Sequence, residues 1–227
     1  MDEPVVVDTP DGPGELVVDE ADSAAAVLLL GHGAGGDVDS WDLDLLASRL
    51  PELGVSVVRF RQPYRVAGRK VFSSAPALDR AWTCALAAVR TGWPDLPLFT
   101  GGRSAGARAA CRCADDSQSG LVLLSFPLHQ PGRPEKSRAG ELTAVTLPAL
   151  VVQGSADAFG TPAEVAEAVA ALPGIQVVAL PGATHGLGPT ARTSPEAVER
   201  RERLLLWAVA GFIEDQLRQP PGPAAKP

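Results

Sequence analysis

Residues 96–113, LPLFTGGRSAGARAACRC, decide the fold that we expect for this chain. The short apolar stretch 98–100 predicts a buried strand, and the Ala-rich run after the glycines predicts a helix. Between them, Gly102-x-Ser104-x-Gly106 fits a nucleophile elbow, a tight strand-to-helix turn with a serine at its apex. The neighbours two positions away must be small because the serine backbone is strained there. The alternative interpretation is a glycine-rich turn that happens to contain a serine.

Length, composition and charge narrow the classes of protein that fit. The 227 residues suit one domain with a large core, and 45% hydrophobic and 21% charged residues are typical of a globular protein. A net charge of −7 argues against general nucleic-acid binding. The first residues lack the pattern of a signal peptide, the longest apolar run is too short to span a bilayer, and 3 cysteines make no disulfide framework. We therefore expect a cytoplasmic protein with neither a membrane nor a nucleic-acid partner.

Apolar runs separated by amphipathic ones predict a layered α/β fold. The run 25–31 is apolar throughout, which is typical of a parallel strand covered by helices on both faces. Further strands are predicted at 15–19, 55–60, 120–128, 149–153 and 175–180. Helices are predicted at 40–53, 76–90 and 195–217, with another starting at Thr161 and Pro162. We expect one domain over 1–218, with a mostly parallel sheet, helices on both faces and no lid domain, followed by a disordered Pro-rich tail at 219–227.

A glycine loop, His32-Gly-Ala-Gly-Gly36, follows the apolar strand 25–31. In enzymes with a nucleophile elbow, this loop supplies the second donor of the oxyanion hole. Its glycines let backbone N–H groups approach a substrate oxygen closely. We expect His32 to shape the loop by hydrogen bonding. A phosphate-binding loop is a weaker alternative because no Gly-Lys-Ser/Thr follows, and a dinucleotide site would need an acidic residue after the next strand, where Arg59 and Arg61 stand.

An acid and a histidine follow the elbow in the chain. Asp157 lies just beyond the predicted strand 149–153, at the sheet edge where α/β proteins place functional groups. Its alternative role is a turn residue that bonds its own backbone. His185 lies in a glycine-rich loop after the last predicted strand, whereas His129 has no comparable context. The order Ser104, Asp157, His185 is nucleophile, acid, histidine.

These residues predict hydrolysis of an ester or similar acyl bond through an acyl-Ser104 intermediate. His185 would move the serine proton, Asp157 would orient His185, and the N–H groups of Ala34 and Ala105 would hold the oxyanion. The expected partner is a small acyl substrate, and neither a metal nor an organic cofactor is needed. Acyl transfer and carbon–carbon bond hydrolysis on the same triad stay open, as does the oligomeric state. The alternative to an enzyme is a non-catalytic interaction domain that kept the same fold.

A basic stretch begins at the C-terminal end of the predicted strand 55–60. It carries five positive charges and no acid, at Arg59, Arg61, Arg65, Arg69 and Lys70. We hypothesise a substrate rim formed by Tyr64, Arg69 and Phe159, suited to substrates with a carboxylate or phosphate. The alternative is a solvated loop whose arginines pair with surface acids.

Several motifs together resemble a known group of proteins. They are His32-Gly-Ala-Gly-Gly36, Arg59-Phe60, Pro63-Tyr64, Gly68-Arg69, Gly101-Gly-Arg-Ser-Ala-Gly-Ala-Arg108, Gly154-Ser-Ala-Asp157 and Ala183-Thr-His185. The chain resembles compact, lidless α/β-hydrolases related to dienelactone hydrolase, above all the branch with the testis-expressed and NSL-complex-subunit hydrolase-like domains. Dienelactone hydrolases use a cysteine nucleophile where Ser104 stands, so their substrate is not carried over. The resemblance implies a hydrolase fold without a firmly assigned substrate, and some relatives act as scaffold domains.

Overall fold

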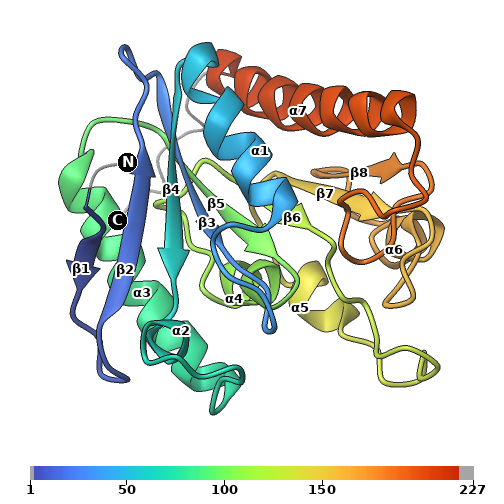
Figure 1. The fold of residues 1–227 in the computed structure, drawn as a ribbon, viewed down its shortest axis with the longest axis horizontal. Helices are drawn as coiled ribbons and strands as arrows, with labels where there is room; N and C mark the ends of the chain where they lie inside the picture. Colours follow the sequence, from blue (N-terminus) through green and yellow to red (C-terminus); the bar gives the residue numbers. More distant parts are fainter. Residues whose placement is uncertain (1–2, 220–227) are drawn as a thin grey trace.

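All strands in the described part of the chain join one sheet. The computed structural model describes residues 3–219, whose eight strands pair in the order β1-β2-β4-β3-β5-β6-β7-β8 (Figure 1). From β4 to β8 in this order every pair is parallel, while β1 and β2 pair antiparallel at one edge. The strands are β1 Val5–Val7, β2 Gly14–Asp19, β3 Ala26–Gly31, β4 Val55–Arg61, β5 Leu98–Arg103, β6 Gly120–Leu124, β7 Ala149–Gly154 and β8 Ile175–Leu180. The predicted mostly parallel sheet is confirmed; the short edge strand β1 was not predicted.

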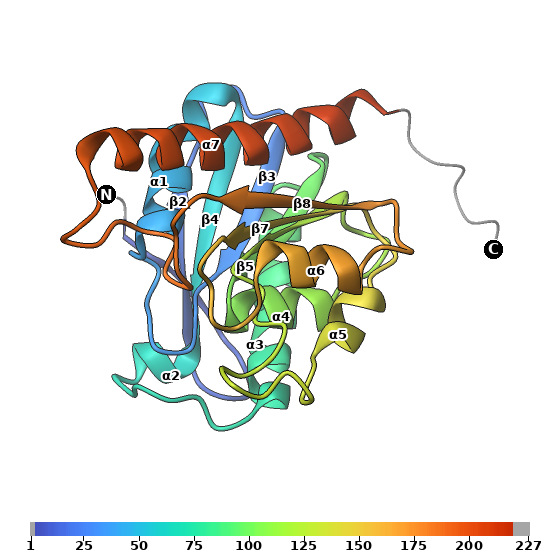
Figure 2. The ribbon, with the colours of Figure 1, turned by 90° about the vertical axis from the view of Figure 1, so that its right-hand side faces the viewer.

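Helices cover both faces of this sheet, as predicted. They are α1 Trp41–Arg49, the 3₁₀ helix η1 Pro51–Leu53, α2 Pro63–Val66, α3 Ala75–Gly92, α4 Ala105–Arg112, α5 Ala139–Thr143, α6 Pro162–Ala168 and α7 Pro195–Arg218. Helices α1 and α7 lie on one face, and α3 to α6 on the other (Figure 2). Side chains alternate along β3, so Leu29 packs in the core under α3 and α4, and Leu28 and Leu30 pack under α1 and α7. This is why β3 is apolar throughout.

Two predicted elements are shortened or divided in the structure. The predicted strand 120–128 ends at Leu124, because Ser125 has φ of +47° and leaves the extended conformation. The predicted helix 40–53 is divided into α1 and η1, and it ends at Gly54, which has φ of +78° as a left-handed cap. Helix α2, at Pro63–Val66, lies within the basic stretch that runs from Arg59 to Lys70.

Two sequence predictions concern the limits of the chain. The predicted tail, 219–227, lies outside the described residues except for Gln219, and both the tail and the single-domain boundary stay predictions. Among residues 3–219, no helix has the length and apolarity that crossing a membrane requires.

Candidate active site

The elbow serine adopts a strained backbone conformation. Ser104 has φ of 53° and ψ of −106°, between the end of β5 and the start of α4. The turn packs directly on the last residue of β3. A Cβ atom on Gly102 or on Gly106 would lie 2.2 or 2.3 Å from the carbonyl oxygen of Gly31. The two glycines of the motif are therefore required by close backbone packing as well as by the strain at Ser104.

Helix α4 directs its free N–H groups toward the serine. The Ser104 carbonyl accepts the first helical hydrogen bond, from the N–H of Arg108 at 3.1 Å. The N–H of Ala105 therefore begins the helix, where no intrahelical acceptor exists. The positive end of the helix dipole lies at the same place. Ala105 is thus suited to donate to an anion that forms beside Ser104.

The structure brings Ser104, His185 and Asp157 together in one hydrogen-bonded chain. His185 Nε2 lies 2.9 Å from Ser104 Oγ. On the other side of the ring, His185 Nδ1 lies 2.9 Å from Asp157 Oδ2 and 3.1 Å from Oδ1. With its proton on Nδ1, the imidazole donates to the carboxylate and accepts from the serine hydroxyl. The three residues come from the loops after β5, β7 and β8, at the carboxyl edge of the parallel strands.

The carboxylate of Asp157 is buried and held by neutral donors. Its side chain is 0% exposed, and Oδ2 accepts from Gln153 Nε2 at 2.9 Å. The backbone N–H of Phe159 donates to Oδ1 at 2.8 Å, so the turn role considered as an alternative coexists with the contact to His185. Sequence reasoning missed Gln153. The signal available in the sequence was a polar glutamine at the end of an otherwise apolar predicted strand, and the structure shows it fully buried.

Phe159, predicted for the substrate rim, packs on the histidine. Its ring stacks on that of His185 with centroids 4.1 Å apart and planes inclined by 29°. This contact restricts rotation of the imidazole about its own axis. Phe159 therefore lies within the site and helps to orient His185.

The glycine loop after β3 lies beside Ser104. A Cβ atom on Gly33 would be 3.5 Å from the Ser104 Cβ. The carbonyl of Gly33 is held by His32 Nδ1 at 2.8 Å and by the N–H of Gly36 at 3.2 Å. Because the carbonyl of one residue and the N–H of the next point in opposite directions across a trans peptide, these bonds also orient the N–H of Ala34.

His32 shapes this loop through backbone contacts on both ring nitrogens. Its Nε2 accepts from the N–H of Gln62 at 3.1 Å, which requires the neutral ring with the proton on Nδ1. Burial lowers the pKa of His32 below its usual value, which favours this neutral form. The predicted hydrogen-bonding role of His32 is confirmed.

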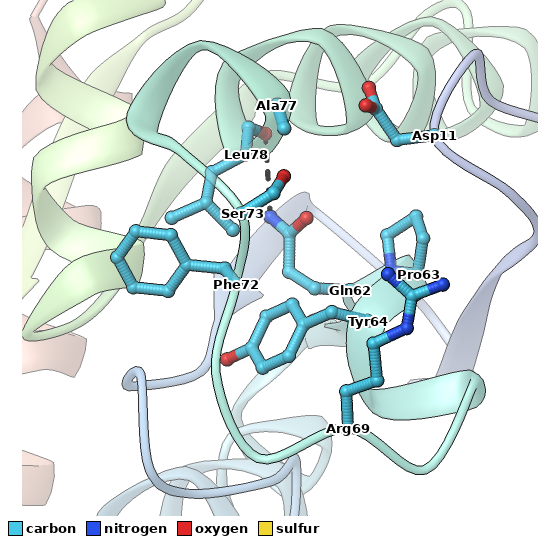
Figure 3. Close-up of a pocket in the computed structure, with 9 residues that line it drawn as sticks. All are labelled: Asp11, Gln62, Pro63, Tyr64, Arg69, Phe72, Ser73, Ala77 and Leu78. Carbon is cyan, nitrogen blue, oxygen red and sulfur yellow. Dashed lines mark hydrogen bonds between the residues drawn. The ribbon is translucent and has the colours of Figure 1, made fainter.

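Tyr64 and Arg69, also predicted for the rim, line a small pocket next to this loop (Figure 3). The pocket has a volume of about 80 Å³ and includes Phe72, whose ring packs edge-on against Tyr64. The Tyr64 hydroxyl donates to the Ala34 carbonyl at 2.9 Å. Burial raises the pKa of Tyr64 to about 12, which keeps the hydroxyl protonated as a donor.

Three of the five positive charges in the basic stretch have acidic partners, as the alternative of arginines that pair with acids expects. Arg59 is buried and paired with Asp19 and Asp44, while Arg61 and Arg65 share Asp37. These acids are distant in the sequence, so the sequence alone does not indicate which acid pairs with which arginine. Within residues 3–219, the guanidinium of Arg69 and the ammonium of Lys70 have no acidic partner, and both side chains are exposed. Any positive rim is therefore limited to this pair.

The comparisons with known proteins agree with the fold. Residues 24–213 match the α/β-hydrolase domain family. The chain belongs to the α/β-hydrolase family. Among residues 3–219 of this α/β-hydrolase, no group of three or more His, Cys, Asp or Glu could hold a metal ion.

Solved structures share the fold over nearly the whole chain. A serine hydrolase without a lid from Xanthomonas campestris is 24% identical, with a TM-score of 0.73 and 96% of each chain covered. An α/β serine hydrolase homologue from Coxiella burnetii is 20% identical, with a TM-score of 0.74, over 91% of this chain and 96% of that one. A dienelactone hydrolase from Anabaena variabilis is 18% identical, with a TM-score of 0.72, over 96% and 99%. At these identities the likeness establishes the fold alone.

Proposed function

We propose that this α/β-hydrolase is a serine hydrolase that cleaves an ester or related acyl bond through an acyl-Ser104 intermediate. The observation that supports this most strongly is the hydrogen-bonded chain from Asp157 through His185 to Ser104. The burial of Asp157 and the strained backbone of Ser104 add to it, because a serine held in this conformation exposes its hydroxyl to substrate. A carboxylesterase-like activity and the resemblance to the testis-expressed and NSL-subunit branch are parts of this proposal.

The proposed reaction has two half-reactions, acylation of Ser104 and hydrolysis of the acyl-enzyme. Ser104 Oγ attacks the acyl carbon while His185 Nε2 takes its proton, and the negative charge moves to the carbonyl oxygen. The leaving alcohol departs with the proton from His185, which leaves the acyl-enzyme. Water then loses a proton to His185, attacks the acyl carbon and releases the acid, and Ser104 regains the proton. Asp157 stabilises the imidazolium in both half-reactions.

The N–H groups of Ala105 and Ala34 would bind the oxyanion from two sides. Ala105 begins α4, and the orientation of the Ala34 N–H follows from the bonds to the Gly33 carbonyl. Both donors are in place before substrate arrives, so little reorganisation is needed during the reaction. The proposed substrate is a small acyl compound. Arg69 and Lys70 are the positive charges that would favour an anionic one.

A serine-directed fluorophosphonate probe tests this proposal. We expect it to label Ser104, as located by peptide mass mapping, and to label neither Ser104→Ala nor heat-unfolded protein. Hydrolysis of p-nitrophenyl acetate by Ser104→Ala should fall by several orders of magnitude, on the order of 10⁶ in another triad enzyme. Ser48→Ala, on the exposed side of α1, is the matched control and should keep wild-type values. Wild-type turnover by Ser104→Ala would show that the mechanism is wrong.

A further inference from the structure

Arg103, the residue before the elbow serine, connects three parts of the site. Its Nη2 donates to the carbonyl of His185 at 2.9 Å, and its Nε lies 3.2 Å from Asp42 Oδ2 on α1. Nη1 lies against the glycine loop, since a Cβ atom on Gly33 or Gly36 would be 3.2 or 4.0 Å away from it. One guanidinium thus contacts the loop of the proposed base and the loop of a proposed oxyanion donor.

The acid that pairs with Arg103 is buried completely. The side chain of Asp42 is 0% exposed, against 15% for Arg103. A buried carboxylate needs a partner, and the fork of an arginine can reach several acceptors at once. Asp42 is the second residue of α1, where the helix dipole also favours a negative charge. The ion pair connects the guanidinium to α1, while Arg103 Nε and both carboxylate oxygens of Asp42 make no hydrogen bond within residues 3–219, and burial raises the pKa of Asp42.

Helix α1 also contacts the histidine loop directly. A Cβ atom on Gly188 would be 3.1 Å from the Cβ of Trp41. Arg201 of α7 donates to the carbonyls of Pro181 and Gly188, at the two ends of this loop, at 3.1 and 3.3 Å. Arg201 is not in contact with the glycine loop in the described contacts. Arg103 contacts both the histidine loop and the glycine loop, as Ser104 does through its hydroxyl and its Cβ.

We infer that Arg103, anchored by Asp42, is a positioning residue that sets the distance between His185 and the oxyanion donor at Ala34. The expected effect of Arg103 on turnover rests on the proposed function. It assigns Arg103 no contact with substrate. Its consequence is that kcat depends on the guanidinium fork itself, and that a positive charge of another shape does not replace it. A displacement of about 1 Å can cost about 100-fold in rate.

Three variants separate positioning from simple neutralisation of Asp42. Arg103→Lys keeps the charge but lacks the fork, and we expect kcat to fall roughly 10- to 100-fold with KM unchanged. Arg103→Met leaves Asp42 buried without a partner, so its melting temperature should fall as well. The double variant Asp42→Asn/Arg103→Met removes both charges. It should regain most of the thermal stability but keep the low kcat. Arg112→Lys is the matched control, since Arg112 pairs with Asp79 and Glu141 at the far end of α4.

Hydrogen exchange measured by mass spectrometry gives a readout that does not depend on catalysis. In Arg103→Lys, peptides covering 32–38 and 181–189 should exchange faster than in wild type, while peptides of β6 should not change. Unchanged exchange in both loops would overturn the inference, whatever the activity. Recovery of wild-type kcat by the double variant would overturn it too, as would a rise in KM confined to anionic esters. An inactive, unlabelled wild type would instead contradict the proposed function, and exchange would still decide the role of Arg103.

Discussion

Two histidines of this protein follow strands of the same sheet and stand in glycine-rich loops, but their ring nitrogens face different groups. His32 is buried, and both of its nitrogens contact backbone groups, those of Gly33 and Gln62. His185 is partly exposed, and its nitrogens face a carboxylate and a serine hydroxyl. The first arrangement favours one neutral tautomer permanently. The second would let Nε2 take the proton of Ser104 while Asp157, on the other side of the ring, stabilises the imidazolium.

The difference shows how the surroundings of a histidine determine what it can do. Backbone N–H and carbonyl groups keep the same charge throughout a reaction, so His32 has no partner with which to exchange a proton. Its contacts hold the Gly33 peptide in place. A carboxylate stabilises the imidazolium form, which suits the same kind of ring to the general-base role proposed for His185. A position after a strand and a neighbouring glycine do not by themselves distinguish the two roles.

The largest effect is expected when the carboxylate partner of His185 is removed. Asp157→Asn should leave the fold intact but lower kcat by about 10⁴, as the same change does in the triad of another fold. The reason is that an amide can stabilise the wrong tautomer of the imidazole and does not balance its positive charge. Initial rates with p-nitrophenyl acetate and a circular dichroism melt measure both outcomes.

Asp115→Asn is the control for this substitution, because Asp115 is exposed and bonds only to its own turn at Ser117. It should keep wild-type turnover. A loss of only about twofold in Asp157→Asn would restrict Asp157 to its turn role and would leave His185 no better supported than His32.

A smaller effect, on stability, is expected for the backbone-bonded histidine. The pKa of His32 is lower in the folded protein than in the unfolded chain, so the unfolded chain binds more protons below about pH 6.5. The free energy of unfolding should therefore fall as the pH decreases from that value toward the folded pKa, by up to about 1.4 kcal/mol per pH unit. Urea unfolding at about pH 7 and about pH 5.5 measures this difference.

His32→Asn should unfold with a weaker dependence on pH over this range. His129→Asn is the matched control: His129 is similarly buried, and its Nε2 lies 3.5 Å from Glu164. An equal pH dependence in wild type and His32→Asn would show that His32 is free to take up a proton, contrary to its two backbone bonds.

The smallest effect is expected on the preference for anionic over neutral esters, through Arg69 on the His32 side of the site. Arg69 is exposed and lines the pocket behind Tyr64, so it can attract an anionic ester without contacting the reacting atoms. Arg69→Ala should lower the ratio of kcat/KM for matched anionic and neutral esters about two- to fivefold at low salt. The preference should fade at high salt, where the Debye length shrinks from about 10 Å at 0.1 M to about 3 Å at 1 M. Lys70→Ala, outside the pocket lining, should change the ratio less. Equal constants for the two esters in wild type would eliminate the charge preference.

The parts of the site that depend on local chain geometry could be predicted from the sequence. Ser104, Asp157 and His185 each follow a strand, and parallel strands bring their carboxyl ends to one edge. Contacts that depend on tertiary packing could not. Asp42 is a charge on the buried face of α1, and nothing nearby in the sequence indicates that Arg103 neutralises it. The same holds for Arg59, whose acids Asp19 and Asp44 come from β2 and α1.

Tyr64 gives this protein a built-in spectroscopic reporter. The chain contains 1 tyrosine, and its hydroxyl donates to the carbonyl of Ala34, beside the proposed oxyanion donor. A fluorotyrosine introduced throughout the protein would therefore yield a single fluorine resonance from the edge of the active site. Its chemical shift would follow the glycine loop when a covalent inhibitor occupies Ser104. The loop could thus be monitored during inhibition without a substitution or an attached dye.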